Sequence, residues 1–108
     1  MENELYMITV FFKHDQAKNL DEIQTYLKES GFWREFPPQG IEIVSWYVMM
    51  GLGHVVTIKV PASRLREVNI IIEKRAWKAF TTDFYPTYNF MPFYREFHED
   101  AIRKDHLD

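Results

Sequence analysis

The sequence of 108 residues contains no cysteine. This absence excludes disulfide bonds, thiolate catalysis and metal sites with cysteine ligands. Strong charge of either sign is also absent, since the formal net charge is −3 and the isoelectric point is about 5.8. A nucleic-acid-binding domain usually carries a basic surface. We therefore expect no nucleic-acid partner, and we find neither a glycine-rich phosphate loop nor a recognisable Ser-His-Asp arrangement.

Long apolar runs, repeats, low-complexity segments and linkers are absent as well. The run Leu5–Phe12 is too short to span a bilayer. Acidic residues precede it, whereas a secretory signal peptide begins with a basic region. We expect a cytoplasmic protein with no membrane association. Its 108 residues suffice for one domain with one core, and residues 92–108 form a charged C-terminal extension of that domain.

Apolar and aromatic side chains are abundant. Hydrophobic residues make up 46% of the chain, which argues against disorder. Nine Phe, six Tyr and three Trp are many for a domain of this size. Such side chains need large pockets, a partner surface or a ligand to cover them.

Four strands are predicted from runs of β-branched and aromatic residues. They cover Leu5–Lys13, Ile41–Met50, His54–Val60 and Thr81–Phe90. Pro86 lies within the last run and favours an edge strand or a bulge there. The segment Gly51-Leu52-Gly53 predicts a hairpin loop between the second and third strands.

Two helices are predicted after the first and third strands. Asn19 and Glu22 form a capping-box pattern at the start of the first helix, and Gly31 is placed to end it. The second helix opens at Pro61-Ala62-Ser63. Its apolar residues recur three and four positions apart, at Leu65, Val68, Ile72, Ala76 and Ala79. Beyond Pro92 the charged chain is consistent with a short helix.

The order strand, helix, strand, strand, helix, strand is that of the ferredoxin-like fold. We predict an α+β protein with a four-stranded antiparallel sheet and both helices on one face. The sheet is apolar on its other face too: seven of the eight residues Leu5–Phe12 and eight of the ten residues Ile41–Met50 are apolar. We therefore expect a homodimer that pairs the two open faces sheet to sheet. The alternative is that the aromatic C-terminal segment, with Phe90, Phe93, Tyr94 and Phe97, folds back over this face.

Strand parity assigns side chains to the two faces. The helix-facing set contains Ile8, Val10, Phe12, Val56, Ile58 and Val60, and Trp46 joins it. The open-face set contains Met7, Thr9, Phe11, Lys13, Val55, Thr57 and Lys59, together with Ser45, Tyr47 and Met49. Its mixture of hydroxyl and aromatic groups is typical of a small cavity. We name Thr9, Phe11, Tyr47, Thr57 and Tyr88 as candidate substrate-binding residues. For Tyr88, as for Tyr85 and Asn89, a packing or interface role is the alternative.

His54 is the candidate catalytic residue. It lies at a strand edge beside a glycine loop, and an imidazole with a pKa near 6.5 suits proton transfer at neutral pH. A structural hydrogen bond is the alternative. His54 shares parity with Val56, so the strand end would have to turn it toward the open face. We expect the first and third strands to be adjacent and parallel. That would leave His14 in an exposed position at the end of the third strand away from His54.

The C-terminal histidines predict no metal site. His98-Glu99-Asp100 and His106 lack the HxH and HExxH spacings of metal-binding sequences. A solvated tail accounts for them. We expect no metal and no cofactor, with haem bound through a histidine as a further alternative.

The element pattern resembles the dimeric α+β-barrel superfamily over nearly the whole chain. Single positions are similar to muconolactone isomerase: Gly53-His54 opens the third strand, Val60 ends it, and Leu65 and Asn69 lie in the next helix. Gly31-Phe32-Trp33-Arg34 is similar to the glycine, tryptophan and arginine that precede the second strand there. Trp77-Lys78-Ala79-Phe80 and residues 84–94 have no counterpart in that family. The resemblance implies a homodimer; superfamily members include isomerases, cyclases, cofactor-free monooxygenases, haem-binding enzymes and proteins without known activity.

The leading hypothesis is a small-molecule enzyme of this type, an isomerase, cyclase or cofactor-free monooxygenase. It would act on an apolar or aromatic compound in a cavity between helices and sheet or inside the dimer barrel. The alternative is a non-catalytic small-ligand-binding or stress-associated protein of the same fold. An RNA-binding module is disfavoured because the third strand, HVVTIKV, lacks stacking aromatics and the chain is acidic.

Overall fold

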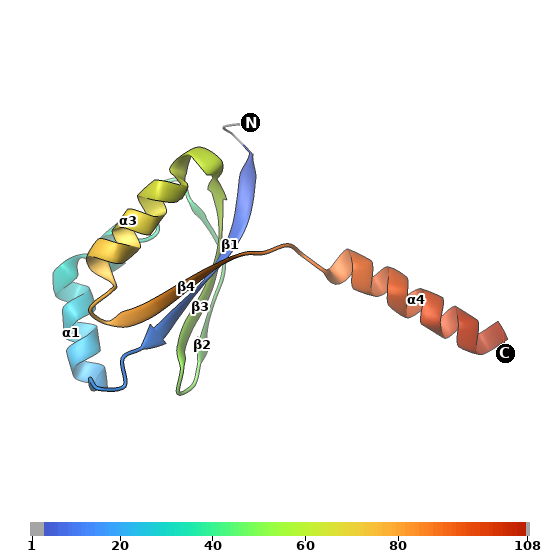
Figure 1. Ribbon diagram of the computed structural model, residues 1–108, viewed down its shortest axis with the longest axis horizontal. Helices are drawn as coiled ribbons and strands as arrows, with labels where there is room; N and C mark the ends of the chain where they lie inside the picture. The colour runs from blue at the N-terminus through green and yellow to red at the C-terminus, as the bar shows by residue number, and fades with distance from the viewer. Residues whose placement is uncertain (1–3, 108) are drawn as a thin grey trace.

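The computed structural model describes residues 4–107, with side chains through residue 104, and contains four strands and several helices. Figure 1 shows the helices α1 and α3 on one side of the sheet, while α4 extends away from the other side. The elements in chain order are β1 (Leu5–His14), α1 (Leu20–Ser30), α2 (Phe32–Glu35), β2 (Glu42–Met49), β3 (Gly53–Pro61), the short 3-10 helix η1 (Ala62–Arg64), α3 (Leu65–Arg75), β4 (Phe80–Pro86) and α4 (Met91–Leu107).

The sheet is antiparallel throughout, with the strand order β2-β3-β1-β4. The predicted α+β class and four-stranded antiparallel sheet are confirmed. The expectation that the first and third strands run parallel is wrong. The tight β2–β3 hairpin reverses the chain, and α1 returns it so that β2 runs parallel to β1. β3 pairs with β2 on one side and with β1 on the other, and it is antiparallel to both.

The core lies between the sheet and the helices α1, α2 and α3. The side chains of Val10, Phe12, Val56, Ile58 and Val60 have no exposed surface, whereas the intervening residues on β1 and β3 are partly exposed or exposed. This alternation confirms the predicted strand parity. Each large apolar side chain buried in this way contributes about 1.5–3 kcal/mol. Burial on the helix-covered face of the sheet therefore stabilises the folded protomer.

The ends of α1 are fixed by local sequence. The side chain of Asn19 accepts a hydrogen bond from the backbone N–H of Glu22, and the Glu22 side chain accepts one from the N–H of Asn19. This is the predicted capping box. Gly31 ends the helix in the left-handed region with φ 84°, where a side chain would be strained. The chain then enters α2 directly.

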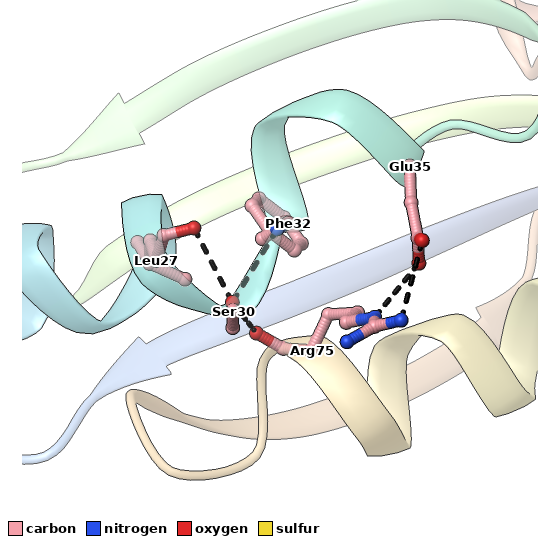
Figure 2. A network of polar contacts seen from close by, with 5 residues as sticks. All are labelled: Leu27, Ser30, Phe32, Glu35 and Arg75. Carbon is pink, nitrogen blue, oxygen red and sulfur yellow. Dashed lines mark hydrogen bonds and ion pairs between the residues drawn. The ribbon is translucent and has the colours of Figure 1, made fainter.

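A polar network fastens α1 and α2 to the end of α3 (Figure 2). The Ser30 hydroxyl donates to the carbonyl oxygen of Arg75 at 2.8 Å and accepts from the N–H of Phe32. The Arg75 guanidinium contacts both carboxylate oxygens of Glu35, at 2.7 and 3.2 Å. A bidentate pair of this kind fixes orientation as well as distance. It holds α2, and with it Trp33, over the sheet.

Strand boundaries differ from the predicted ones by one residue in most cases, and three predictions of element length differ by more. The last strand ends at Pro86 instead of Phe90, and one further backbone hydrogen bond follows it, from the N–H of Thr87 to the carbonyl oxygen of Met7. β4 is nevertheless an edge strand, as Pro86 predicts. The second main helix ends at Arg75, and the following turn keeps Ala76 and Ala79 buried. The C-terminal helix has 17 residues and is not short.

Two surfaces remain uncovered in the described chain. The open face of the sheet carries no helix, since α4 projects away from it (Figure 1). The aromatic stripe of Phe90, just before α4, and Phe93, Tyr94 and Phe97 on α4 follows helical spacing, and each of its side chains is about half exposed. None of the helices in residues 4–107 is sufficiently long and apolar to cross a membrane.

Candidate functional site

His14 and His54 lie together at one end of the helix-covered face. Their ring centroids are 5.6 Å apart, and both rings contact Phe80. The antiparallel register produces this contact, because His54 pairs with Phe12 and His14 follows two residues later on the same face. The N–H of His14 also donates to the carbonyl oxygen of Leu52 in the hairpin loop. The predicted separation of the two histidines is therefore wrong.

Both histidines line a cavity of about 290 Å³. Except for Gln24, the rest of its lining is apolar or aromatic: Leu20, Ile23, Leu27, Trp33, Val48 and Phe80. An apolar cavity of about 150 Å³ is enough to hold benzene. The space beside the two imidazoles therefore suits a compound built on one aromatic ring or on an aliphatic group of similar size.

The tautomer of His54 is determined by Trp46. The indole Nε1 of Trp46 donates a hydrogen bond to Nδ1 of His54 at 2.9 Å. An indole N–H can only donate, so Nδ1 must carry the lone pair and the proton of the neutral ring is on Nε2. Nε2 has no hydrogen-bonding partner among the described residues. Every buried side-chain nitrogen or oxygen atom of the described residues has a hydrogen-bonding partner. Because Nε2 of His54 has none, its N–H is accessible to solvent.

The surroundings of His54 also keep it neutral. Burial lowers the pKa of His54 below its ordinary value of 6.5, and repulsion from His14 lowers it further. Protonation would in addition place a hydrogen on Nδ1, opposite the N–H of Trp46, and break that hydrogen bond. At neutral pH, His54 is therefore a neutral hydrogen-bond donor.

A second hollow lies on the open face, beside the segment that leads to α4. Its volume is about 610 Å³, and its lining includes Met7, Ser45, Thr57, Lys59 and Tyr88. A chain of hydroxyl groups crosses this face next to it. The Thr87 hydroxyl donates to Thr9 Oγ1 at 2.7 Å, and the Thr9 and Thr57 hydroxyl oxygens are 3.0 Å apart.

The structure separates the predicted catalytic residue from the predicted substrate-binding residues. Thr9, Phe11, Tyr47 and Thr57 lie on the open face of the sheet, and Tyr88 lies above the same face. His54 lies on the helix-covered face with Trp46 and Phe80. Within one protomer the sheet therefore stands between His54 and these five residues. Only Thr57 and Tyr88 line the same hollow.

Sequence reasoning missed three aromatic residues of the site around His54, namely His14, Trp46 and Trp33. His14 was placed at the wrong end because the strand direction was wrong, and an antiparallel register would have found it. Trp46 shares strand parity with His54 through the pairs Trp46–Val56 and Val48–His54, so the signal for their contact was present. Trp33 depends on the turn between α1 and α2, which no periodic pattern predicts.

Within residues 4–104, no group of three or more His, Asp or Glu side chains is close enough to hold a metal ion. The predicted tail histidine His106 lies outside the described side chains. Nε2 of His54 carries a proton while Trp46 occupies Nδ1, so this nitrogen is not free to coordinate iron or another metal.

No protein-family model matches this sequence, and comparison with curated proteins and with solved structures yields no match either.

Proposed function

We propose that the protein is a small-molecule enzyme that moves a proton on an apolar or aromatic carbonyl compound, as an isomerase or cyclase does. The observation that carries this proposal is the pair of imidazoles at the apolar cavity, one of them held as a neutral donor by Trp46. General acid–base catalysis needs a proton acceptor and a donor placed near the same ligand. His14 and His54 can supply these two roles.

In the proposed step, an unprotonated ring nitrogen of His14 accepts a proton from the carbon next to the carbonyl group. The electron pair of the C–H bond forms a C=C bond, and the carbonyl π pair moves to the oxygen. Nε2–H of His54 donates a hydrogen bond to this oxyanion. His14 then returns the proton to another carbon of the conjugated enolate, the electron pair on the oxygen re-forms the carbonyl group, and the C=C bonds shift by one position. The product is an isomer, so the step needs no oxidant or reductant.

The proposed assembly is a homodimer of ferredoxin-like units, the dimeric α+β barrel. The element order and the strand order β2-β3-β1-β4 support the fold. The open sheet face supports the dimer, because Tyr47 and Tyr85 are more than half exposed there. A soluble monomer rarely leaves such a surface uncovered.

The helix α4 belongs to the same proposed interface and packs through its aromatic stripe against the second copy. Its 17 residues span about 25 Å, close to the roughly 23–33 Å of the strands. With strands about 4.8 Å apart and a helix about 10 Å wide, the four-stranded face and one side of α4 together cover roughly 700 Å² per protomer. Stable dimers bury about 800 Å² per partner. The two uncovered surfaces thus match the area that one dimer needs.

A deuterium-exchange experiment tests the catalytic function. Compounds that copurify with the protein are identified by mass spectrometry and incubated with it in D2O. We expect deuterium at the carbon next to the carbonyl group, and a loss of this exchange of about 100-fold or more in His14→Gln. His98→Gln, which changes an exposed histidine of α4, is the control. A bound ligand that gains no deuterium would contradict the proposal.

The second candidate is a non-catalytic ligand-binding protein of the same fold. One observation favours it: the described lining of the cavity contains no Asp or Glu to orient His14, although a catalytic base is usually oriented by a third group. In that case the ligand would bind in the cavity, and both His14→Gln and the wild-type protein would leave its C–H bonds unexchanged.

A further inference from the structure

We propose that Trp46 is a positioning residue that holds His54 in a single tautomer, and that the cavity consequently selects ligands that present an acceptor oxygen to Nε2–H. This inference rests on the proposed function in one respect, namely that the histidine cavity is the binding site. It adds the chemical class of the group that the ligand must carry, a carbonyl or enolate oxygen next to an apolar body.

The position of the Trp46 N–H is fixed by aromatic packing. The indole stacks on Phe12 with an interplanar angle of 10°, lies against Trp33 at 29°, and meets the ring of Phe36 edge-on. Phe12 itself is fully buried. An indole held on several sides has little freedom to rotate its N–H away from His54. The 2.9 Å hydrogen bond is therefore a property of the packed core and not of a mobile side chain.

The polarity of this hydrogen bond determines what His54 can do. Most structural partners of a histidine, such as a carboxylate or a backbone carbonyl, accept from one ring nitrogen and leave a lone pair on the other. Trp46 does the reverse, because its N–H donates to Nδ1. The accessible nitrogen then carries a hydrogen and no lone pair. It can bind an oxygen acceptor, but it cannot bind an ammonium group, a hydroxyl donor or a metal ion.

The roles of the two histidines follow from this asymmetry. Nε2 of His54 has no lone pair while Nδ1 accepts from Trp46, so it cannot accept a proton from the ligand. Among the cavity residues, His14 is the other titratable group and has no such constraint from Trp46. The acceptor oxygen of the ligand therefore lies against His54, and the carbon that loses its proton lies toward His14.

The tautomer of His54 can be measured without any ligand. Nitrogen-15 NMR of the imidazole rings distinguishes a protonated from an unprotonated ring nitrogen. In the wild-type protein at pH 7.5 we expect an unprotonated Nδ1 and a protonated Nε2. Trp46→Phe keeps an aromatic ring in the stack and removes the N–H, so both tautomers should become populated. Trp33→Phe is the matched control, because Trp33 stacks on the same indole and has no hydrogen bond to His54.

Two ring-matched probes test the ligand class. Acetophenone carries a carbonyl oxygen, and α-methylstyrene carries a CH2 group in its place. We expect the wild-type protein to bind acetophenone roughly three- to tenfold more tightly, the value of one hydrogen bond. Trp46→Phe should reduce this ratio toward one. Trp77→Phe, the same substitution at an indole that donates to Thr82 outside this cavity, is the binding control and should keep it.

The outcomes separate this inference from the proposed function. A protonated Nδ1 in the wild-type protein, or an unchanged tautomer in Trp46→Phe, overturns the role of Trp46 whether or not a ligand binds. Equal affinity for the two probes overturns the ligand class and leaves the cavity as a binding site. If neither probe binds at millimolar concentration, the cavity is not the site, and the ligand class and the proposed function both fail.

Discussion

The two faces of the sheet are built from the same strands and have opposite properties. On the helix-covered face, Val10 and Phe12 of β1 meet Val56 and Ile58 of β3, and all four are fully buried. On the open face, Thr9 and Thr57 share a hydrogen bond and remain partly exposed. Sequence composition alone does not reveal this difference, because both faces contain large apolar residues. What distinguishes them is whether another element of the same chain covers them.

The two faces also affect different processes: the covered face affects the folding of one protomer, and the open face affects its association with a second copy. The covered face has its partners in α1, α2 and α3, and its histidines lie where that cover ends, beside a cavity. The open face and the stripe on α4 have no such partners in the described part of the chain. Substitutions on the covered face should therefore change the stability of one protomer, and substitutions on the open face should change association.

The largest expected effect is on the covered face. Ile58→Ala removes a fully buried side chain and leaves a cavity, so the free energy of unfolding should fall by about 2–5 kcal/mol. Lys59→Ala, the next residue on the exposed face, should change it by less than about 0.5 kcal/mol. Urea denaturation at one protein concentration measures both. Equal losses for the two variants would contradict the assignment of faces.

The next effect concerns the open face. Sedimentation equilibrium at micromolar concentration should give about twice the 13.1 kDa mass of one chain. Thr57→Arg places an unpaired charge in the proposed interface and should raise the dimer dissociation constant by about 100-fold or more. Thr25→Arg, on the exposed side of α1, should leave the dimer intact. A wild-type monomer would overturn the dimer, and a dimeric Thr57→Arg would place the interface elsewhere.

The same measurement tests the stripe on α4. Phe97 is the most exposed member of the stripe, at 62%. Phe97→Ser should weaken the dimer by about tenfold or more if this ring is buried against the second copy. Glu99 lies on the opposite side of the helix, and Glu99→Ser should have little effect. Equal dissociation constants for the two variants would show that α4 lies outside the interface.

The parts of the fold that sequence predicted depend on local rules. The capping box at Asn19, the left-handed Gly31 and the alternation in β1 each follow from a few neighbouring residues, and all are confirmed. The features that were predicted wrongly depend on contacts between residues that lie far apart in the sequence. The meeting of His14 and His54 requires the direction of two strands that lie far apart in sequence. The true length of α4 was missed because its charged side obscured a regular aromatic stripe.

The candidate site shows the same limit. His54 was found because a histidine beside a glycine loop is conspicuous in sequence. Its tautomer was beyond reach, since it depends on which nitrogen faces Trp46 across the β2–β3 hairpin. The predicted substrate residues on the open face stay a prediction, because parity groups residues by face and does not decide which face binds a ligand.

The smallest expected effect is the pH dependence caused by His54. Burial and the neighbouring His14 lower the pKa of His54 in the folded protein, so in the window below about 6.5 the unfolded chain binds more protons at this position. Stability from this group is therefore present above pH 6.5 and is lost as the pH falls from 6.5 through the lowered pKa of the folded protein. Replacing the imidazole with Gln removes the titration and keeps an oxygen that can accept from Trp46.

Thermal unfolding of the wild-type protein and of His54→Gln between pH 7.5 and 5.5 measures this contribution. At pH 7.5 the two melting temperatures should be close, because the amide still offers an acceptor. As the pH falls, the wild-type value should decrease more steeply than that of His54→Gln, and the exposed-histidine variant His98→Gln should follow the wild-type curve. Parallel curves for the wild-type protein and His54→Gln would mean that His54 titrates alike in the folded and unfolded chains. The imidazole would then be free to ionise in the cavity, and Trp46 would not hold it neutral.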